Sequence, residues 1–165
     1  MATAAYSKLI DQLCELTMIS NPSAFYEQAN LSVKDVDFTL RHNSGVGEGD
    51  VFIYCSYGAL PKTNRELVLE RLLEANLLLF SGPLSPSLSY NADTEHVILC
   101  GHAMIENLTA ERLLGLMGGI ADMALVWREG YFIENDQATR STNAKPQQAT
   151  NVSKSGLGVN AALLR

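Results

Sequence analysis

The longest strongly apolar stretch of the chain runs from residue 64 to residue 80, NRELVLERLLEANLLLF. At about 100° per residue, its apolar side chains cover more than half of a helix, whereas an ordinary surface helix has an apolar stripe over about a third. Its polar strip is Glu70 and Glu74, with Arg71 beside them. Each exposed leucine forgoes about 1.5–3 kcal/mol. The pattern predicts a helix shared with a second copy of the chain in a homodimer, the alternative being a central helix in a single-chain core.

The preceding segment predicts one helix and three strands. Residues 4–18 form an amphipathic helix pattern. Residues 30–42 alternate between apolar and polar, but the phase slips at Lys34-Asp35, which predicts two strands joined by a tight turn. Residues 44–50 are glycine-rich and predict a hairpin loop before a third strand over 51–57. Because this third strand is apolar on both faces, we expect both to be covered.

The segment that follows the leucine-rich helix predicts two strands and one helix. Gly82-Pro83 ends the leucine-rich helix, and strands are predicted over 87–91 and 96–105. Thr109 is the expected N-cap of a last helix that runs to about Glu129, with Gly130 directly after it.

Three glycines interrupt the last predicted helix at positions 115, 118 and 119. Each lowers helix propensity by about 1 kcal/mol. We expect them to allow close approach of a neighbouring backbone; the alternative is a tolerated local weakness.

The order of predicted elements is α-β-β-β-α-β-β-α, which indicates an α+β fold with a twisted antiparallel sheet and helices. Residues 1–133 are expected to form one domain. Residues 134–165 are rich in Ser, Thr, Asn, Gln and Lys, so we expect a polar, flexible tail.

Composition and charge narrow the function classes. The sequence has no run of 18 apolar residues, so it predicts no membrane span. Residues 1–16 lack an apolar block of signal-peptide type, so we expect the protein to be cytoplasmic. Cys14, Cys55 and Cys100 are odd in number and widely spaced, as expected of reduced thiols. Residues 1–134 hold 8 of the 12 basic and 17 of the 18 acidic residues, a formal net charge of −9. Such a domain repels phosphate backbones, so nucleic acid is not the expected partner.

Several residue groups are candidates for chemistry, and each has a structural alternative. His96, Cys100 and His102 share one face of a predicted strand and with Cys55 are a candidate metal site, but their spacing matches no common zinc pattern. The glycines of the 44–50 loop join two strands and lack the lysine of a phosphate-binding loop. Cys14 lacks an identifiable catalytic partner. We expect no enzyme, metal or cofactor, which leaves the binding of another protein as the favoured function.

The chain resembles a class I type III secretion chaperone of the Tir-chaperone family over about residues 4–133. The likeness lies in the LLEANLL segment of residues 72–78 and in the segments around it, which are Phe52-Ile53-Tyr54, Gly58-Ala59-Leu60-Pro61, Gly82-Pro83, Leu88-Ser89-Tyr90, Val97-Ile98-Leu99 and Leu108-Thr109-Ala110-Glu111-Arg112-Leu113.

The resemblance implies a cytoplasmic homodimer that binds the N-terminal region of a secreted effector in extended, non-globular form and delivers it to the secretion apparatus and its ATPase. By this likeness the dimer residues are Leu69, Leu73, Leu77, Leu88 and Tyr90. The expected effector contacts are Leu9, Leu13, Leu16, Phe38, Leu40, Phe52 and Tyr54. Two alternatives remain, a small metal-binding enzyme that uses His96, Cys100 and His102, and a regulatory adaptor that binds a folded partner.

Overall fold

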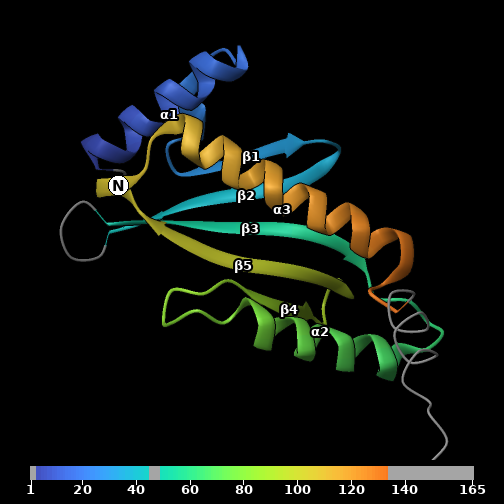
Figure 1. Cartoon of the computed structure of the whole chain (residues 1–165). Coiled ribbons are helices and arrows are strands. Elements are labelled where there is room, and N and C mark those ends of the chain that lie inside the picture. The colour runs from blue at the N-terminus through green and yellow to red at the C-terminus, as the bar shows by residue number, and fades with distance from the viewer. Residues whose placement is uncertain (1–2, 45–48, 134–165) are drawn as a thin grey trace, which may run out of the picture.

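The computed structural model of the protein describes residues 3–44 and 49–133, so the predicted tail lies outside the described residues. The predicted element order is confirmed, with two additional short 3-10 helices (Figure 1). The elements are α1 (Ala4–Thr17), η1 (Pro22–Phe25), β1 (Gln28–Val33), β2 (Val36–Asn43), β3 (Asp50–Ala59), α2 (Arg65–Leu79), β4 (Ser87–Asn91), β5 (His96–Met104), η2 (Ile105–Asn107) and α3 (Ala110–Gly130).

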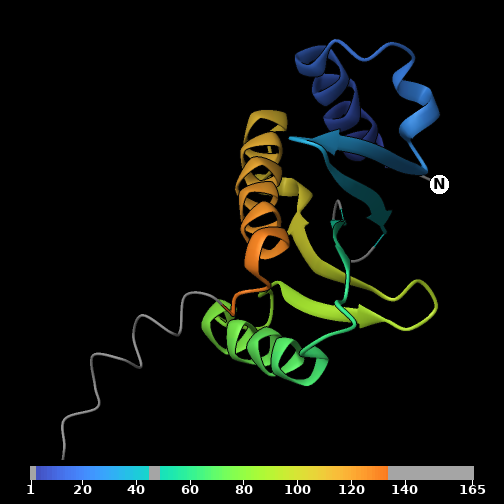
Figure 2. The ribbon, with the colours of Figure 1, turned by 90° about the vertical axis from the view of Figure 1, so that its right-hand side faces the viewer.

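The five strands form one antiparallel sheet in the order β1-β2-β3-β5-β4, so β1 and β4 are its edges. The helices α1 and α3 pack on one face of this sheet, and α2 lies beside the edge strand β4 (Figures 1 and 2). The fold is α+β, as the sequence predicted.

Both predicted hairpins form, for local reasons. At the predicted phase slip, Lys34 and Asp35 have φ angles of 53° and 60° and make a two-residue turn between β1 and β2. This left-handed backbone is the one that two-residue hairpin turns use. Gly49, directly before β3, has a φ angle of 84°, and a Cβ there would collide with the Asn43 carbonyl oxygen. Only glycine fits this close approach, while residues 45–48 of the same loop are outside the described residues.

The core lies between one face of the sheet and the helices. Alternate strand residues Phe38, Ile53 and Leu99 belong to the same buried cluster as Trp127 of α3 and Tyr6 of α1. The expectation that both faces of β3 are covered is met only in part, because within one copy of the chain the helices cover one face. Its Phe52 and Tyr54 lie on the face away from α1 and α3 and are half-buried, Phe52 against its ring neighbours Tyr54 and His102.

The last helix begins at its predicted cap, where the Thr109 hydroxyl accepts a hydrogen bond from the backbone of Arg112. The predicted end is wrong by one residue, because Gly130 is helical and Tyr131 takes the left-handed cap. Near this end, the Arg128 guanidinium donates to three carbonyls, those of Tyr57 (2.7 Å), Ser56 (2.9 Å) and Asp35 (3.2 Å). The C-terminal end of α3 is thereby joined both to the bulge of β3 and to the β1–β2 turn.

The edge strand β4 is closed by a side chain of α2. The Asn76 amide donates to the Leu88 carbonyl (3.0 Å), and its oxygen accepts from the Leu88 N–H (2.7 Å). Leu88 is thus bonded on its outer side as it would be by another strand. The amide both holds α2 against the sheet and occupies the middle of this edge.

Replacement of Asn76 tests this connection. We expect Asn76→Leu to lower the free energy of unfolding by about 1–3 kcal/mol, because it keeps the side-chain size but leaves two backbone groups of Leu88 without partners. Asn76→Asp keeps the acceptor and loses the donor, so it should also destabilise. Urea denaturation followed by circular dichroism measures both, and an Asn76→Leu protein as stable as the wild type would contradict the assignment.

Buried ionisable groups link the core to pH. Burial raises the pKa of the Cys55 thiol from its usual 9.0 to about 12, and it raises the pKa of Tyr6 to about 12. The unfolded chain loses these protons at lower pH than the folded chain. Their contribution to stability is therefore complete below pH 9 and is lost as the pH rises toward about 12.

We expect the melting temperature to be nearly constant from pH 7 to about 8.5 and to fall above about pH 9. Cys55→Val removes one of the titrating groups, so its melting temperature should fall less steeply over the same range, with a residual fall from Tyr6. Thermal melts at matched ionic strength measure this, and parallel curves for the two proteins would refute the role of Cys55.

Candidate functional site

The edge strand β1 is open, in contrast to β4. Its two-residue turn makes Val33 and Val36 a hydrogen-bonded pair, so the backbone groups of Gln28, Asn30 and Ser32 point away from β2. Within the described ranges, no turn, loop or inter-element backbone hydrogen bond involves β1. The sequence of β1, QANLSV, also lacks the lysine or proline that often protects an edge strand. β1 therefore offers unpaired donors and acceptors to an incoming strand.

An apolar cavity of about 280 Å³, here called the edge pocket, lies beside β1. Helix α1, η1, β1 and α3 all contribute to it. Its lining is Leu13, Thr17, Ile19, Phe25, Asn30, Leu31, Ser32, Val33, Leu114 and Met117. Side chains of a strand point alternately to its two faces. A chain paired with β1 would therefore direct every second side chain toward the helices and this pocket.

The residues predicted to contact an effector divide into three groups. Leu9, Phe38 and Leu40 are in the core and offer no surface to a partner while the chain keeps this packing. Leu13 is also buried but lines the edge pocket, and Leu16 is 46% exposed on α1. Phe52 and Tyr54 lie on the other face of the sheet. Their roles stay predictions.

The edge pocket also contains residues that the sequence reasoning did not select. Ile19 and Phe25 belong to the connection between α1 and β1, and Leu114 lies on the flank of α3. The available signal was weak. An apolar residue in a short polar connection, such as Phe25, often indicates that the loop packs against the core. It does not show whether a cavity remains beside the loop.

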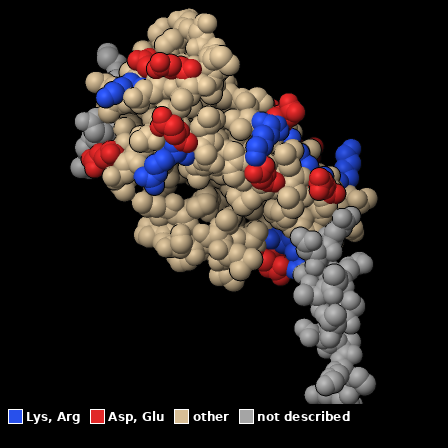
Figure 3. All heavy atoms as spheres, turned by 45° about the horizontal axis from the view of Figure 1, so that its top comes forward, with Lys and Arg blue, Asp and Glu red and all other residues tan. Residues whose placement is uncertain are grey.

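The α2 region has an unpartnered apolar surface, here called the α2 surface. It consists of Leu73, Leu77, Leu78, Phe80 and Leu84, which are between 51% and 87% exposed. Only Val68 and Leu72 of α2 are buried. The predicted excess of apolar side chains is therefore real in one copy of the chain. Figure 3 shows that charged side chains are sparse at the lower left of the face it presents and more frequent above and to the right.

The predicted dimer residues do not all belong to this surface. Leu73 and Leu77 are exposed by 69% and 76%. Leu69 and Tyr90 are half-buried, and the Arg65 guanidinium lies 4.9 Å from the centre of the Tyr90 ring. Leu88 is buried within its own chain at 7% exposure. The involvement of all five in a dimer stays a prediction.

The candidate metal set is not brought together. In the antiparallel pairing of β3 with β5, Cys55 is opposite Leu99 and Tyr54 is opposite Cys100, so Cys55 and Cys100 lie on opposite faces of the sheet. The grouping of Cys55 with Cys100 is therefore wrong. Among residues 3–44 and 49–133, no three His, Cys, Asp or Glu side chains are arranged to hold a metal ion. Burial raises the pKa of Cys14, Cys55 and Cys100, which disfavours a reactive thiolate.

The described helices include none that is both long and apolar enough to cross a membrane.

Comparison with known proteins gives a likeness in fold. No protein-family model and no curated protein sequence matches the chain. One similar solved structure is a chain of the HopA1–SchA chaperone–effector complex, with 16% identity over 76% of this chain and 94% of that chain, at a TM-score of 0.57. Another is a chain of the ExsC–ExsE complex, with 14% identity over 78% and 95%, at a TM-score of 0.63.

A third similar structure is a chain of the ExoT–SpcS complex from Pseudomonas aeruginosa, with 15% identity over 73% of this chain and 96% of that chain, at a TM-score of 0.52. The first of these structures is a complex of a chaperone with an effector. The alignment with this protein covers almost the full length of each of the three matched chains. The chain therefore has the fold of the class I type III secretion chaperones.

Proposed function

We propose that the protein is a cytoplasmic chaperone for type III secretion that binds the N-terminal region of an effector in extended form. In this proposal it works as a homodimer and presents the effector to the secretion apparatus and its ATPase. The observation that carries the proposal is the open β1 edge beside the apolar edge pocket. The fold that the chain shares with chains from chaperone–effector complexes supports the same function.

Strand addition explains how such a site holds an unfolded client. The backbone groups of β1 bond an extended segment of almost any sequence, and the edge pocket selects segments with apolar side chains at alternate positions. Each aliphatic side chain buried there contributes about 1.5–3 kcal/mol. Ordering the segment costs several kcal/mol in return, which keeps binding reversible. Delivery requires release, so moderate affinity suits this function.

The α2 surface supports the homodimer. Five large apolar side chains between Leu73 and Leu84 are more than half exposed. The burial free energy that they forgo is large for a domain whose total stability is typically about 5–15 kcal/mol. A second copy presents the same surface, and a two-fold pairing covers both. The dimer leaves β1 free, because β1 lies at the opposite edge of the sheet from α2 and β4.

A proline on the open edge tests the binding site. Asn30→Pro removes an outward N–H of β1 without removing a bond to β2, which an edge strand tolerates. We expect it to weaken capture of an effector segment about tenfold or more while the melting temperature stays within a few degrees. Asn30→Ala is the matched control, because it keeps the N–H and loses only the side-chain hydrogen bonds to Gln28 and Thr39.

The probe for this test is each secreted protein encoded beside the chaperone, co-expressed with it and purified as a complex. Limited proteolysis should leave a short N-terminal segment of the client protected by the chaperone. A compact protected domain of the client would instead indicate an adaptor for folded proteins. Equal capture by wild type and Asn30→Pro would refute strand addition at β1.

Charge on the α2 surface tests the dimer. We expect Leu77→Asp combined with Leu73→Asp to halve the mass measured by light scattering at micromolar concentration, because two buried carboxylates would have no partners across the interface. Leu16→Asp is the control, since Leu16 is an exposed leucine on α1, remote from α2. Leu13→Asp is unsuitable here because it would place a charge in the core. A monomeric wild-type protein, or an unchanged mass of the double variant, would contradict the proposed dimer.

A further inference from the structure

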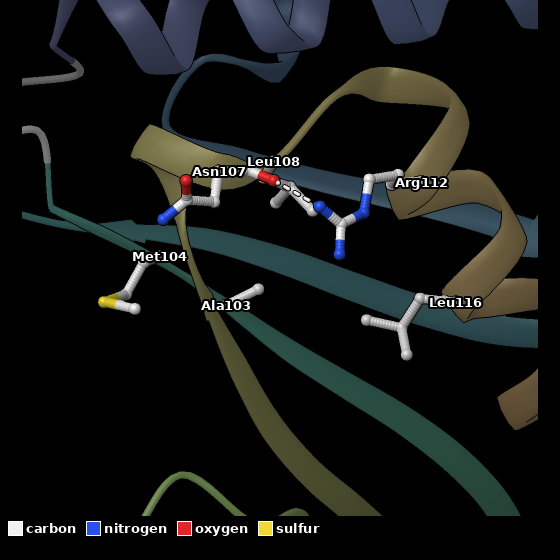
Figure 4. Close-up of a pocket in the computed structure, with 6 residues that line it drawn as sticks. All are labelled: Ala103, Met104, Asn107, Leu108, Arg112 and Leu116. Atoms are coloured by element: carbon white, nitrogen blue, oxygen red, sulfur yellow. Dashed lines mark hydrogen bonds between the residues drawn. The ribbon is translucent and has the colours of Figure 1, made fainter.

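A second cavity lies on the other flank of α3. This η2 pocket has a volume of about 270 Å³ and is lined by Ala103, Met104, Asn107, Leu108, Arg112 and Leu116. In Figure 4 the Arg112 side chain extends from α3 toward η2, and Leu116 and Ala103 border the same space. The lining is mainly aliphatic, with one guanidinium at its rim.

The charge of Arg112 is not neutralised by a carboxylate within the described chain. One guanidinium nitrogen donates to the Asn107 carbonyl at 3.0 Å, and no ion pair of Arg112 is present among the described residues. Its neighbour Glu111 is engaged elsewhere, since hydrogen bonds from its own backbone N–H and from Thr109 lower its pKa. The remaining N–H groups of Arg112 are suited to an incoming carboxylate.

The two pockets are separated by the outer surface of the first turns of α3. Leu114 and Met117 line the edge pocket on one flank, and Arg112 and Leu116 line the η2 pocket on the other. At about 100° per residue, Gly115, Gly118 and Gly119 fall between these flanks on the outer side. A Cβ at any of the three would meet nothing within 4 Å. The close backbone approach that the sequence predicted is therefore not made by any described part of this chain.

We propose that an extended client segment bound at β1 crosses α3 over these glycines and places an aliphatic side chain and an adjacent Asp or Glu in the η2 pocket. The proposal rests on the function proposed above and adds the chemistry of a second anchor. A helix is about 10 Å wide and an extended residue spans about 3.3 Å, so at least about three residues are needed to cross it, and a spacer of five leaves slack. Because the glycines have no side chains, the client backbone can lie directly on the helix backbone, and Arg112 pairs with the carboxylate of the client.

The arrangement gives the site selectivity for charge. Residues 1–134 carry a formal net charge of −9, so an acidic segment is generally repelled. Arg112 makes one position on this path attractive to a carboxylate. A segment with the acid at the correct distance from the strand gains affinity, while one with the acid elsewhere loses it.

The test uses the full chain and synthetic fluorescein-labelled peptides, with binding measured by fluorescence anisotropy. The short peptide has seven residues that alternate Leu and Ser. The extended peptides add a five-residue Gly-Ser spacer and then Leu-Glu or Leu-Lys, at either end. We expect the Leu-Glu extension at one end to tighten binding about tenfold, and the Leu-Lys extension to give no gain.

Two variants separate the anchor from the strand site. Arg112→Glu should reverse the preference from Leu-Glu to Leu-Lys and leave the short peptide unchanged. Gly115→Leu with Gly118→Leu should remove the gain while raising the melting temperature, because leucine favours helix over glycine. Val126→Leu, an aliphatic exchange on the same helix nearer its C-terminus, is the control and should keep the gain.

The outcomes distinguish the two proposals. If the short peptide binds wild type but not Asn30→Pro and no extension adds affinity, the second anchor is wrong and strand addition stands. If the short peptide binds wild type and Asn30→Pro equally, or binds neither protein, both proposals fail. A gain that survives Arg112→Glu and the glycine replacements would also overturn the second anchor.

Discussion

The structure depends on whether the outward backbone N–H and C=O groups at each edge of one antiparallel sheet have hydrogen-bond partners. Two hydrogen bonds from the Asn76 amide to Leu88 occupy the outer side of β4 and hold α2 there. In this position α2 buries only Val68 and Leu72 in the core, and Leu73, Leu77 and Leu78 remain exposed. The opposite edge, β1, keeps unpaired backbone groups beside an apolar cavity. One closed and one open edge thus give the chain two separate surfaces, an apolar one on α2 and one with unpaired backbone groups at β1.

The element order could be predicted because the local signals agreed. The phase slip at Lys34-Asp35 was enough to divide two strands, and Thr109 marked the start of α3. The excess of leucine in α2 correctly predicted side chains that one copy does not bury. These features are set by residues close to one another in the sequence, and hydrophobic periodicity reports such local patterns. The helices η1 and η2 have only four and three residues, too few to produce a period.

The candidate site was predicted less well, for a physical reason. Periodicity shows that Leu9, Leu13 and Leu16 share a face of α1, but not that this face turns its first two leucines into the core and leaves the third at 46% exposure. The same limit applies to Phe38 and Leu40, which lie under the helices. Cys55 and Cys100 were placed together although the register of β3 and β5 separates them, and register depends on pairing between distant segments. Asn76 had no signal of its own, since a polar residue in an apolar helix is usually read as solvent-facing.

The three hydrogen bonds of Arg128 have a mechanical consequence for α3. They attach the C-terminal end of the helix to the bulge of β3 and to the β1–β2 turn, whereas the first turns are held by the Thr109 cap and by apolar contacts, which are not directional. The three glycines lie in the first half of the helix, where they lower its intrinsic helix propensity. The C-terminal end of α3 is therefore fixed in direction by polar bonds, whereas its first turns are fixed by burial, with Leu113 and Met117 enclosed in the core.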